Sequence, residues 1–252
     1  MNDVPKAESR EQSPLLERLF SVGAHFGYSR SRRHPSVTPF IFGAKNNVEI
    51  FDLEKVATLL EQARLYIESL GKERKTILFV GGKNEARQIV KKTAESIDMP
   101  YVAGRWIGGS LTNFSEISKR IKRLEELREK REKGEFAGRY TKRERLMFDR
   151  EIANLERHFD GIVSLKALPS ALMVVDPRRE HIAVSEANQM GIPIVALLNS
   201  DCNVEHITYP IAANDGAVKS ISFFMEEIVQ AYKKGLLSAE KDKKEVESSK
   251  EE

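Results

Sequence analysis

The segment at residues 23–35, GAHFGYSRSRRHP, gathers the side chains of this chain that are best suited to chemistry or to binding a charged partner. It contains two histidines, two aromatic residues and three arginines. No acidic residue occurs between Arg18 and Val48. Such a composition is compatible with a metal site, a catalytic site or a surface that binds a polyanion.

Metal binding and cysteine catalysis are both disfavoured by the spacing of the candidate residues. His25 and His34 have no carboxylate or thiolate close in sequence to complete a tetrahedral site, and the nearby arginines would repel a cation. Cys202 lies four residues before His206, as in a thiol–imidazole pair, but a lone cysteine in a loop after a strand is more often a packed side chain. We therefore predict no metal site, no cofactor and no catalytic residue.

Residues 79–86, FVGGKNEA, give the strongest enzyme-like signal in the chain. A glycine turn between a strand and a helix presents free amide groups and the positive end of the helix dipole to a phosphate. The spacing matches neither the dinucleotide fingerprint nor the P-loop. A nucleotide-binding enzyme with a pocket around Gly81, Gly82 and Asp176 remains an alternative on sequence alone.

A group of acidic residues and one histidine follows a predicted strand at residues 171–177, where sites in α/β proteins usually form. The same residues also begin a helix, where carboxylates stabilise free amide groups. We favour helix capping over acid–base chemistry for this group, which comprises Asp176, Glu180, His181 and Glu186.

The basic residues are more informative because several separate stretches of them suit one kind of partner. Guanidinium groups such as those of Arg30, Arg32 and Arg33 bind phosphate oxygens and stack on bases. Aromatic and imidazole rings stack on unpaired bases in RNA-binding surfaces. Further donors are expected in loops near strand ends, at Lys45, Asn46, Asn47, Arg105 and Trp106. These patterns favour a nucleic-acid-binding surface.

The elements that must position these residues form a repeating pattern. Short apolar strands alternate with amphipathic helices, which is typical of a parallel sheet with helices on both faces. The strands are predicted at residues 48–52, 75–82, 99–106, 171–177, 192–198 and 209–215. A last helix is predicted from Ala217 to about Leu237.

The alternation is interrupted once, at residues 113–159. Two helical stripes of apolar residues flank the glycines of KGEFAGRYT, and nearly all other positions are Lys, Arg or Glu. This pattern predicts an inserted antiparallel coiled-coil hairpin whose narrow apolar seam comprises Ile117, Ile121, Leu124, Leu127, Leu146, Ile152, Leu155 and Phe159.

Four regions follow from this reading of the chain. They are a flexible lead-in at 1–13, an α/β body at 14–112 and 160–237, the hairpin at 113–159, and a disordered charged tail at 238–252. The 252 residues are 31% charged with a formal net charge of +3, and the chain contains no apolar run of the length that a membrane span needs. The amino-terminal residues lack the apolar region of a signal peptide, so we expect a cytoplasmic protein without a membrane partner.

The chain resembles the bacterial-type small-subunit ribosomal protein S2 family over residues 15–237. The motifs that carry the resemblance are, in order, GAHFG (23–27), PFIFGAKNNVEIFDLEK (39–55), ILFVGGK (77–83), RWIGGSLTN (105–113), LPSALMVVD (168–176), IAVSEANQMGIPIVAL (182–197) and NDGAVKSI (214–221). The chain departs from the family pattern at Tyr28, where a second histidine is common, and at Ala212 and Ala213 in the loop at 200–216.

The resemblance implies a flavodoxin-like α/β body with a protruding hairpin, and a structural role in the ribosome rather than an enzymatic one. It implies binding to small-subunit rRNA near the junction of head and body, and contact with neighbouring proteins, including the large mRNA-binding protein of the subunit. No small-molecule substrate is expected. The residues that we predict to contact RNA are His25, Phe26, Tyr28, Arg30, Arg32, Arg33, Lys45, Asn46, Arg105, Trp106 and Asn113. A hairpin scaffold that binds only protein is the second alternative.

Overall fold

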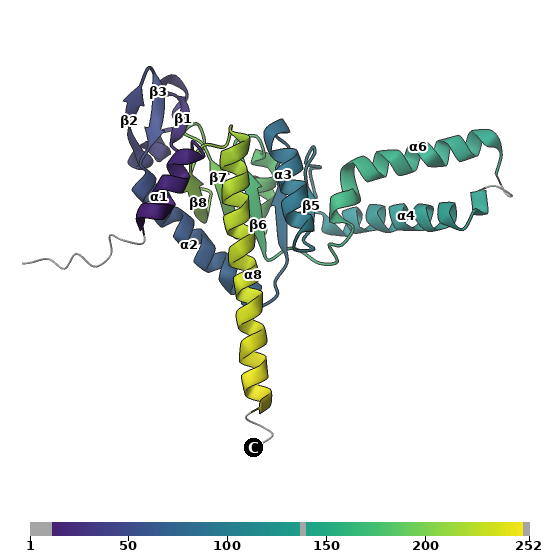
Figure 1. Ribbon diagram of the computed structural model, residues 1–252. Coiled ribbons are helices and arrows are strands. Elements are labelled where there is room, and N and C mark those ends of the chain that lie inside the picture. The colour runs from purple at the N-terminus through teal and green to yellow at the C-terminus, as the bar shows by residue number, and fades with distance from the viewer. Residues whose placement is uncertain (1–11, 137–139, 249–252) are drawn as a thin grey trace, which may run out of the picture.

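The body is built on a five-stranded parallel sheet, seen in the computed structural model of residues 12–136 and 140–248 (Figure 1). The strands are β4 (Ile77–Val80), β5 (Tyr101–Val102), β6 (Ala171–Val175), β7 (Ile194–Leu198) and β8 (Tyr209–Ala212). Their order in the sheet is β5-β4-β6-β7-β8, and every neighbouring pair is parallel. This is the flavodoxin-like order, so the predicted fold class is confirmed.

The continuous apolar strands are explained by burial on both faces of the sheet. Every residue of β4, β6 and β7 is buried. The right-handed crossovers through α3 (Asn84–Glu95) and α7 (His181–Gln189) run in opposite directions along the sheet, so these helices cover opposite faces. On the face turned to the viewer in Figure 1, α3 lies beside α8 (Val218–Ser248).

Helix α2 (Leu53–Lys72) packs against α8 and approaches it most closely at two glycines. A Cβ atom added to Gly71 would collide with the backbone carbonyl of Tyr232, and one added to Gly235 would collide with that of Glu68. The two helix backbones therefore approach each other closely at this crossing. The helix α1 (Gln12–Ser21) packs against α2.

Replacing Gly235 by alanine is expected to destabilise the protein, although alanine is normally the better helix former by about 1 kcal/mol. The added methyl group has no room against the carbonyl of Glu68, and overpacking of this kind costs about 1–3 kcal/mol. Chemical denaturation measures the loss. Gly43→Ala is the control, because an added Cβ there meets nothing within 4 Å; an equal effect of both substitutions would contradict the close crossing.

A second, antiparallel sheet carries the basic segment and was only partly predicted. It consists of β1 (Phe26–Ser29), β2 (Ile41–Lys45) and β3 (Val48–Phe51) in the order β1-β3-β2. Asn46 and Asn47 both have positive φ, 51° and 64°, as a tight two-residue hairpin turn requires. The short helices η1 (Arg30–Arg32) and η2 (Pro35–Phe40) connect β1 to β2. The sequence predicted only the strand at residues 48–52.

Two helices project from the body at the predicted insertion. They are α4 (Phe114–Glu132) and α6 (Lys142–Phe159), and η3 (Asp160–Ile162) returns the chain to the body. Seven of the eight predicted seam residues are buried, but Leu146 is 50% exposed. Ion pairs join the helices, with Arg123 bonded to Glu151 at 3.0 Å and Arg128 to Glu156 at 3.0 Å.

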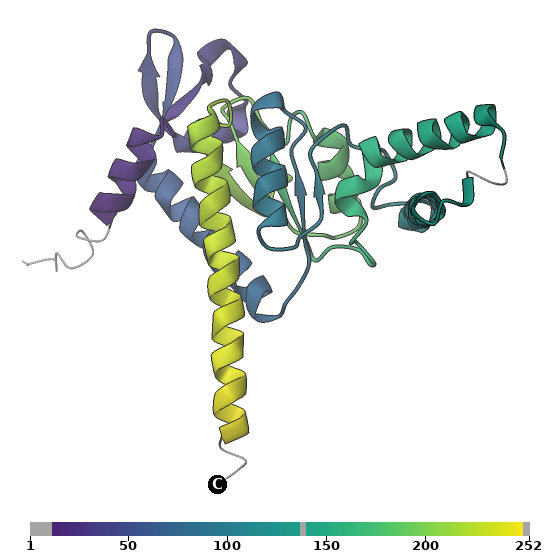
Figure 2. The same cartoon turned by 45° about the vertical axis from the view of Figure 1, so that its right-hand side comes forward.

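The coiled-coil packing of these helices is not confirmed. The view in Figure 2 looks nearly along α4 while α6 lies across the page, so the two helices cross rather than run alongside each other. Exposure of Leu146 in the first half of α6 agrees with this crossing, because a continuous seam would bury it.

The carboxyl-terminal segment differs from the sequence prediction. Helix α8 continues to Ser248, so residues 238–248 are helical rather than disordered. Ala, Glu and Lys residues have high helix propensity, and Arg74 forms an ion pair with Glu240 at 3.3 Å. The predicted flexible lead-in falls almost wholly on residues 1–11, which with residues 137–139 and 249–252 lie outside the described structure. Among the described helices, none combines the length and apolar character that a membrane crossing requires.

Candidate nucleic-acid interface

Polar and basic residues collect where the parallel strands end. Because all five strands run in one direction, the residues that follow them lie along one edge of the sheet. We call this the carboxyl edge; it comprises Gly82, Lys83, Arg105, residues 176–179, residues 199–201 and Asp215. The small sheet is attached beside it, since the backbone N–H of Tyr28 donates to Ser200 Oγ at 2.9 Å and that of His34 donates to the Ser200 carbonyl at 2.8 Å.

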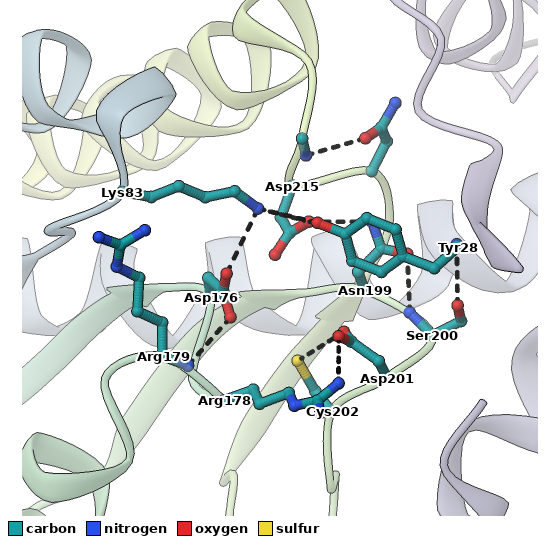
Figure 3. A network of polar contacts seen from close by, with 12 residues as sticks. Tyr28, Lys83, Asp176, Arg178, Arg179, Asn199, Ser200, Asp201, Cys202 and Asp215 are labelled. Carbon is teal, nitrogen blue, oxygen red and sulfur yellow. Dashed lines mark hydrogen bonds and ion pairs between the residues drawn. The ribbon is translucent and has the colours of Figure 1, made fainter. Parts of the chain in front are cut away.

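The centre of the carboxyl edge is a buried ionic cluster around Lys83 (Figure 3). Its Nζ lies 3.2 Å from Asp215 Oδ1 and 3.3 Å from Asp176 Oδ2, and donates to the Tyr28 hydroxyl at 3.1 Å. Burial alone would lower the pKa of Lys83, but Asp215, Tyr28 and Asp176 raise it overall, so the ammonium stays charged. Asn199 Nδ2 also donates to Asp215 Oδ1 at 2.9 Å. The cluster joins β1 to the ends of β4, β6 and β8.

Asp215 is fully buried and gives this cluster a pH dependence. Burial, reinforced by the nearby carboxylate of Asp176, raises the pKa of Asp215 to about 6, while Lys83 opposes the shift. Its Oδ2 has no hydrogen-bond partner among the described residues, which leaves room for a proton there.

The protein is therefore expected to gain stability from Asp215 as the pH falls from about 6 towards 4. In that range the folded state holds a proton that the unfolded state, with a pKa of 3.8, has released. The gain is lost as the pH rises through about 6 and amounts to on the order of 2 kcal/mol. Asp215→Asn should flatten the corresponding part of the stability–pH curve measured by denaturation between pH 4 and pH 7. An unchanged slope would show that Asp215 stays ionised throughout.

The glycine turn after β4 does not offer a phosphate site. The N–H of Gly82 donates to Glu180 Oε1 at 3.0 Å, and a Cβ on Gly82 would lie 2.8 Å from the same oxygen. The Glu180 carboxylate thus occupies the place that a phosphate would take, and Lys83 is held by two aspartates. Burial raises the pKa of Glu180. The geometry does not support the alternative of a nucleotide-binding enzyme at this turn.

The acidic residues that follow β6 do not cap α7. Asp176 Oδ1 accepts from the Arg179 N–H at 3.1 Å, but this bond lies in the turn at residues 177–180, before α7 begins at His181. Glu180 makes no side-chain capping bond to α7. Glu186 lies within α7, and its carboxylate accepts from Trp106 Nε1 at 3.1 Å, from the N–H groups of Gly109, Leu111 and Thr112 at 2.8–3.2 Å and from Thr112 Oγ1 at 3.3 Å.

Glu186 consequently fixes the whole loop between β5 and α4. Burial acts to raise the pKa of Glu186, but the hydrogen bonds from Leu111, Trp106, Gly109 and Thr112 outweigh it and lower the pKa. A charged carboxylate therefore holds the loop from inside. This internal anchor leaves Arg105 at the surface, where its side chain is exposed.

Two of the predicted contact residues are buried, and a third is held in an ion pair. Trp106 is 5% exposed and bonded to Glu186, so it is not available to stack on a base. His25 is buried and stacks on Phe20 with a centroid distance of 4.6 Å, and burial lowers its pKa. Arg33 Nη1 lies 3.1 Å from Oε1 of the buried Glu49. These three residues shape the surface, and the prediction of direct RNA contact is not supported for them.

The other predicted residues divide into two groups by position. One group surrounds the small sheet, and the second lies across the carboxyl edge on the β5–α4 loop. Phe26, Arg30, Arg32, Lys45 and Asn46 are exposed in the first group, and Arg105 and Asn113 are exposed in the second. Tyr28 lies between the groups and is half-buried, with Arg32 Cζ 5.7 Å from the centre of its ring.

The structure adds three exposed arginines that the sequence analysis did not assign to the surface. Arg178 and Arg179 follow β6, and Arg87 lies in the first turn of α3. Arg87, Arg105 and Arg179 line one hollow of about 350 Å³ with Gly82 and Glu180. The signal for two of them was present in the motif DPRREH, whose paired arginines directly follow a buried strand. The exposed arginines together form a surface along the carboxyl edge that we call the basic band. It comprises Arg30, Arg32, Arg87, Arg105, Arg178 and Arg179.

Comparison with known proteins identifies the family. The family profile described as ribosomal protein S2 matches residues 19–235. The small ribosomal subunit protein uS2 of Acidothermus cellulolyticus is 40% identical over 223 residues, which is 88% of this chain and 81% of the relative. That of Nitratiruptor sp. is 40% identical over 220 residues, covering 87% and 82%. That of Dictyoglomus thermophilum is 39% identical over 228 residues, covering 90% and 92%. The chain therefore belongs to the ribosomal protein S2 family.

Proposed function

We propose that the protein is a structural, non-catalytic component of the small ribosomal subunit and acts in translation in the cytoplasm. The observation that carries this proposal is the family match over residues 19–235, joined to relatives that are named as small-subunit proteins and align along most of their length. The way the fold uses its carboxyl edge agrees with such a role. The place where many α/β proteins bind a ligand is filled here by Lys83, Asp176, Asp215 and Glu180.

We further propose that the basic band and the small sheet bind small-subunit rRNA. Arg30, Arg32 and Arg105 are exposed and have no ion-pair partner in the described part of the chain. Such guanidinium groups suit the phosphates of a folded RNA backbone. The exposed ring of Phe26 offers a stacking surface for an unpaired base. Lys45 and Asn46 extend the surface at the tip of the β2–β3 turn.

The family resemblance extends the proposal to the position and partners of the protein. We propose that it lies near the junction of head and body and supports docking of the large mRNA-binding ribosomal protein. The helices α4 and α6 project from the body (Figure 1), and most of their residues are charged. Their projection would allow rRNA and a protein neighbour to be bound at the same time.

Sedimentation tests both the association with the small subunit and the docking of the large mRNA-binding protein. Tagged protein expressed in a cell whose own copy is depleted should run with small-subunit particles in a sucrose gradient. The same particles should contain the large mRNA-binding protein, and particles that lack the tagged chain should contain less of it. Tagged protein that stays at the top of the gradient would contradict a ribosomal role, whereas normal levels of the mRNA-binding protein without the chain would contradict docking alone.

A further inference from the structure

A pocket of about 600 Å³ lies beside the carboxyl edge, and neither the family match nor phosphate binding along the edge accounts for its shape. It lies between the η1–η2 segment, the start of α7 and the loop between β7 and β8. Its volume falls in the range of pockets that take small organic groups. The lining residues are Arg32, Arg33, His34, Pro177, Arg178, His181, Val184, Ser185, Asn188, Asp201, Asn203, His206 and Ile207.

His34 is held in this wall in a defined orientation and tautomer. The Ser36 N–H donates to His34 Nδ1 at 3.3 Å, so this ring nitrogen is an acceptor. The Ser36 Oγ lies 2.7 Å from the same Nδ1 and accepts from the Val204 N–H at 3.1 Å. Because Nδ1 accepts, the neutral ring carries its proton on Nε2. The wall therefore contains a fixed ring whose remaining nitrogen is a hydrogen-bond donor.

The charge of the pocket favours an anion. Asp201 is the one acidic residue of the lining, and Arg178 Nη1 already binds it at 2.6 Å (Figure 3). Arg178 is 59% exposed, and a guanidinium has further N–H groups beyond this one bond. Arg32 is exposed and has no carboxylate partner among the described residues. Two arginine side chains are thus available to one phosphate at the mouth.

The floor of the pocket has a different character from its mouth. Pro177, Val184 and Ile207 are buried apolar residues that line it. An inorganic anion has no apolar surface to bury against these residues, whereas the flat face of a nucleobase is stabilised by contact with them. Asn188, on the neighbouring turn of α7, donates one amide N–H to the His206 carbonyl at 3.1 Å, so its side-chain oxygen and second N–H remain to pair with the edge of a base.

We propose that this pocket receives one unpaired nucleotide of an RNA strand. Its base lies on Pro177, Val184 and Ile207, and its phosphate lies between Arg32 and Arg178, with His34 Nε2 as a further donor. The inference rests on the proposed function in that it names one subsite of the RNA-binding surface. The inference adds that the protein binds an unstacked base in addition to contacting the phosphates of the RNA backbone.

A pair of matched variants on α7 tests the pocket. Ser185→Glu places a carboxylate in the pocket, and Gln189→Glu makes the same charge change one turn further on, outside it. Both positions are exposed, so both variants should fold, which thermal denaturation checks. The full-length protein is titrated against fluorescently labelled triadenylate and triuridylate, and binding is followed by anisotropy. Ser185→Glu should weaken binding about tenfold, and Gln189→Glu less than about twofold, given the usual contribution of one bound base.

Competition then distinguishes the sources of the nucleotide. Unlabelled trinucleotide that competes at least tenfold better than adenosine monophosphate supports an RNA strand as the occupant of the pocket. Equal competition by the two would show that the pocket binds a free nucleotide instead. Ribose 5-phosphate that competes as well as adenosine monophosphate would show that no base is held and would overturn the proposal. So would equal weakening by the two variants. If Ser185→Glu binds trinucleotide normally and the wild-type protein still sediments with small subunits, the pocket fails while the ribosomal role stands.

Discussion

Replacing Arg30, Arg32 and Arg105 together by alanine is expected to weaken binding to small-subunit rRNA by on the order of 100-fold at about 0.15 M salt. All three side chains are exposed on the proposed surface and have no ion-pair partner within the described residues. Each lost phosphate contact should reduce the slope of log affinity against log salt by roughly 0.7–0.9. Filter binding to an rRNA fragment over a range of salt concentrations measures both quantities.

Two controls separate specific contacts from net charge and from folding. Replacing Lys72, Lys92 and Lys233 by alanine makes the same change in net charge at exposed positions elsewhere on the body. This variant should alter the slope of log affinity against log salt by less than about one unit. Arg33→Ala should behave differently again. It leaves the buried Glu49 without its partner, so it should lower the free energy of unfolding more than it changes the salt slope. If the lysine variant matched the arginine variant, binding would be non-specific.

Replacing Glu186 by alanine is expected to have the largest effect on stability of any single substitution in the interface. The change removes the acceptor of five hydrogen bonds to the loop at residues 106–112, most of them donated by backbone N–H groups. Leaving such buried donors unpaired costs about 3–5 kcal/mol. Trp106 is the one tryptophan of the chain, so its fluorescence reports directly on the loop. Its emission should shift to longer wavelength as water reaches the ring.

Two companion variants make the Glu186 experiment decisive. Glu186→Gln keeps one carbonyl oxygen, so its free energy of unfolding should lie between those of the wild-type protein and Glu186→Ala. Glu205→Ala removes an exposed acid on the β7–β8 loop and should change stability by less than about 0.5 kcal/mol. Tryptophan emission that stays unchanged in Glu186→Ala would mean that the loop keeps its shape without the carboxylate.

The main sheet could be predicted because each of its strands carries its own signal. ALMVV and IVALL are continuous apolar runs, and burial on both faces is the environment that such runs require. The small sheet lacked this signal. FGYS and IFGAK contain glycine and expose much of their surface, so neither alternation nor a continuous apolar run marks them as strands.

The candidate site was predictable as a region but not residue by residue. The acid-free stretch around Arg30 and Arg32 indicated where a polyanion would bind. The internal roles of Trp106 and Arg33 depend on Glu186 and Glu49, which are distant in sequence. No local pattern connects an arginine or a tryptophan to a partner that only the fold brings near. An ion pair between two loops, such as Arg178–Asp201, was hidden for the same reason.

Directed cleavage of rRNA within assembled small subunits tests the central claim most directly. The native Cys202 is buried, and burial raises the pKa of its thiol, so an introduced cysteine can be labelled selectively. An iron chelate attached to Ser31→Cys, in η1, should cleave nearby rRNA strongly, while one attached to Lys92→Cys, at the end of α3 away from the carboxyl edge, should cleave it weakly. Strong cleavage from position 92 with little from position 31 would show that the opposite side of the protein faces the RNA.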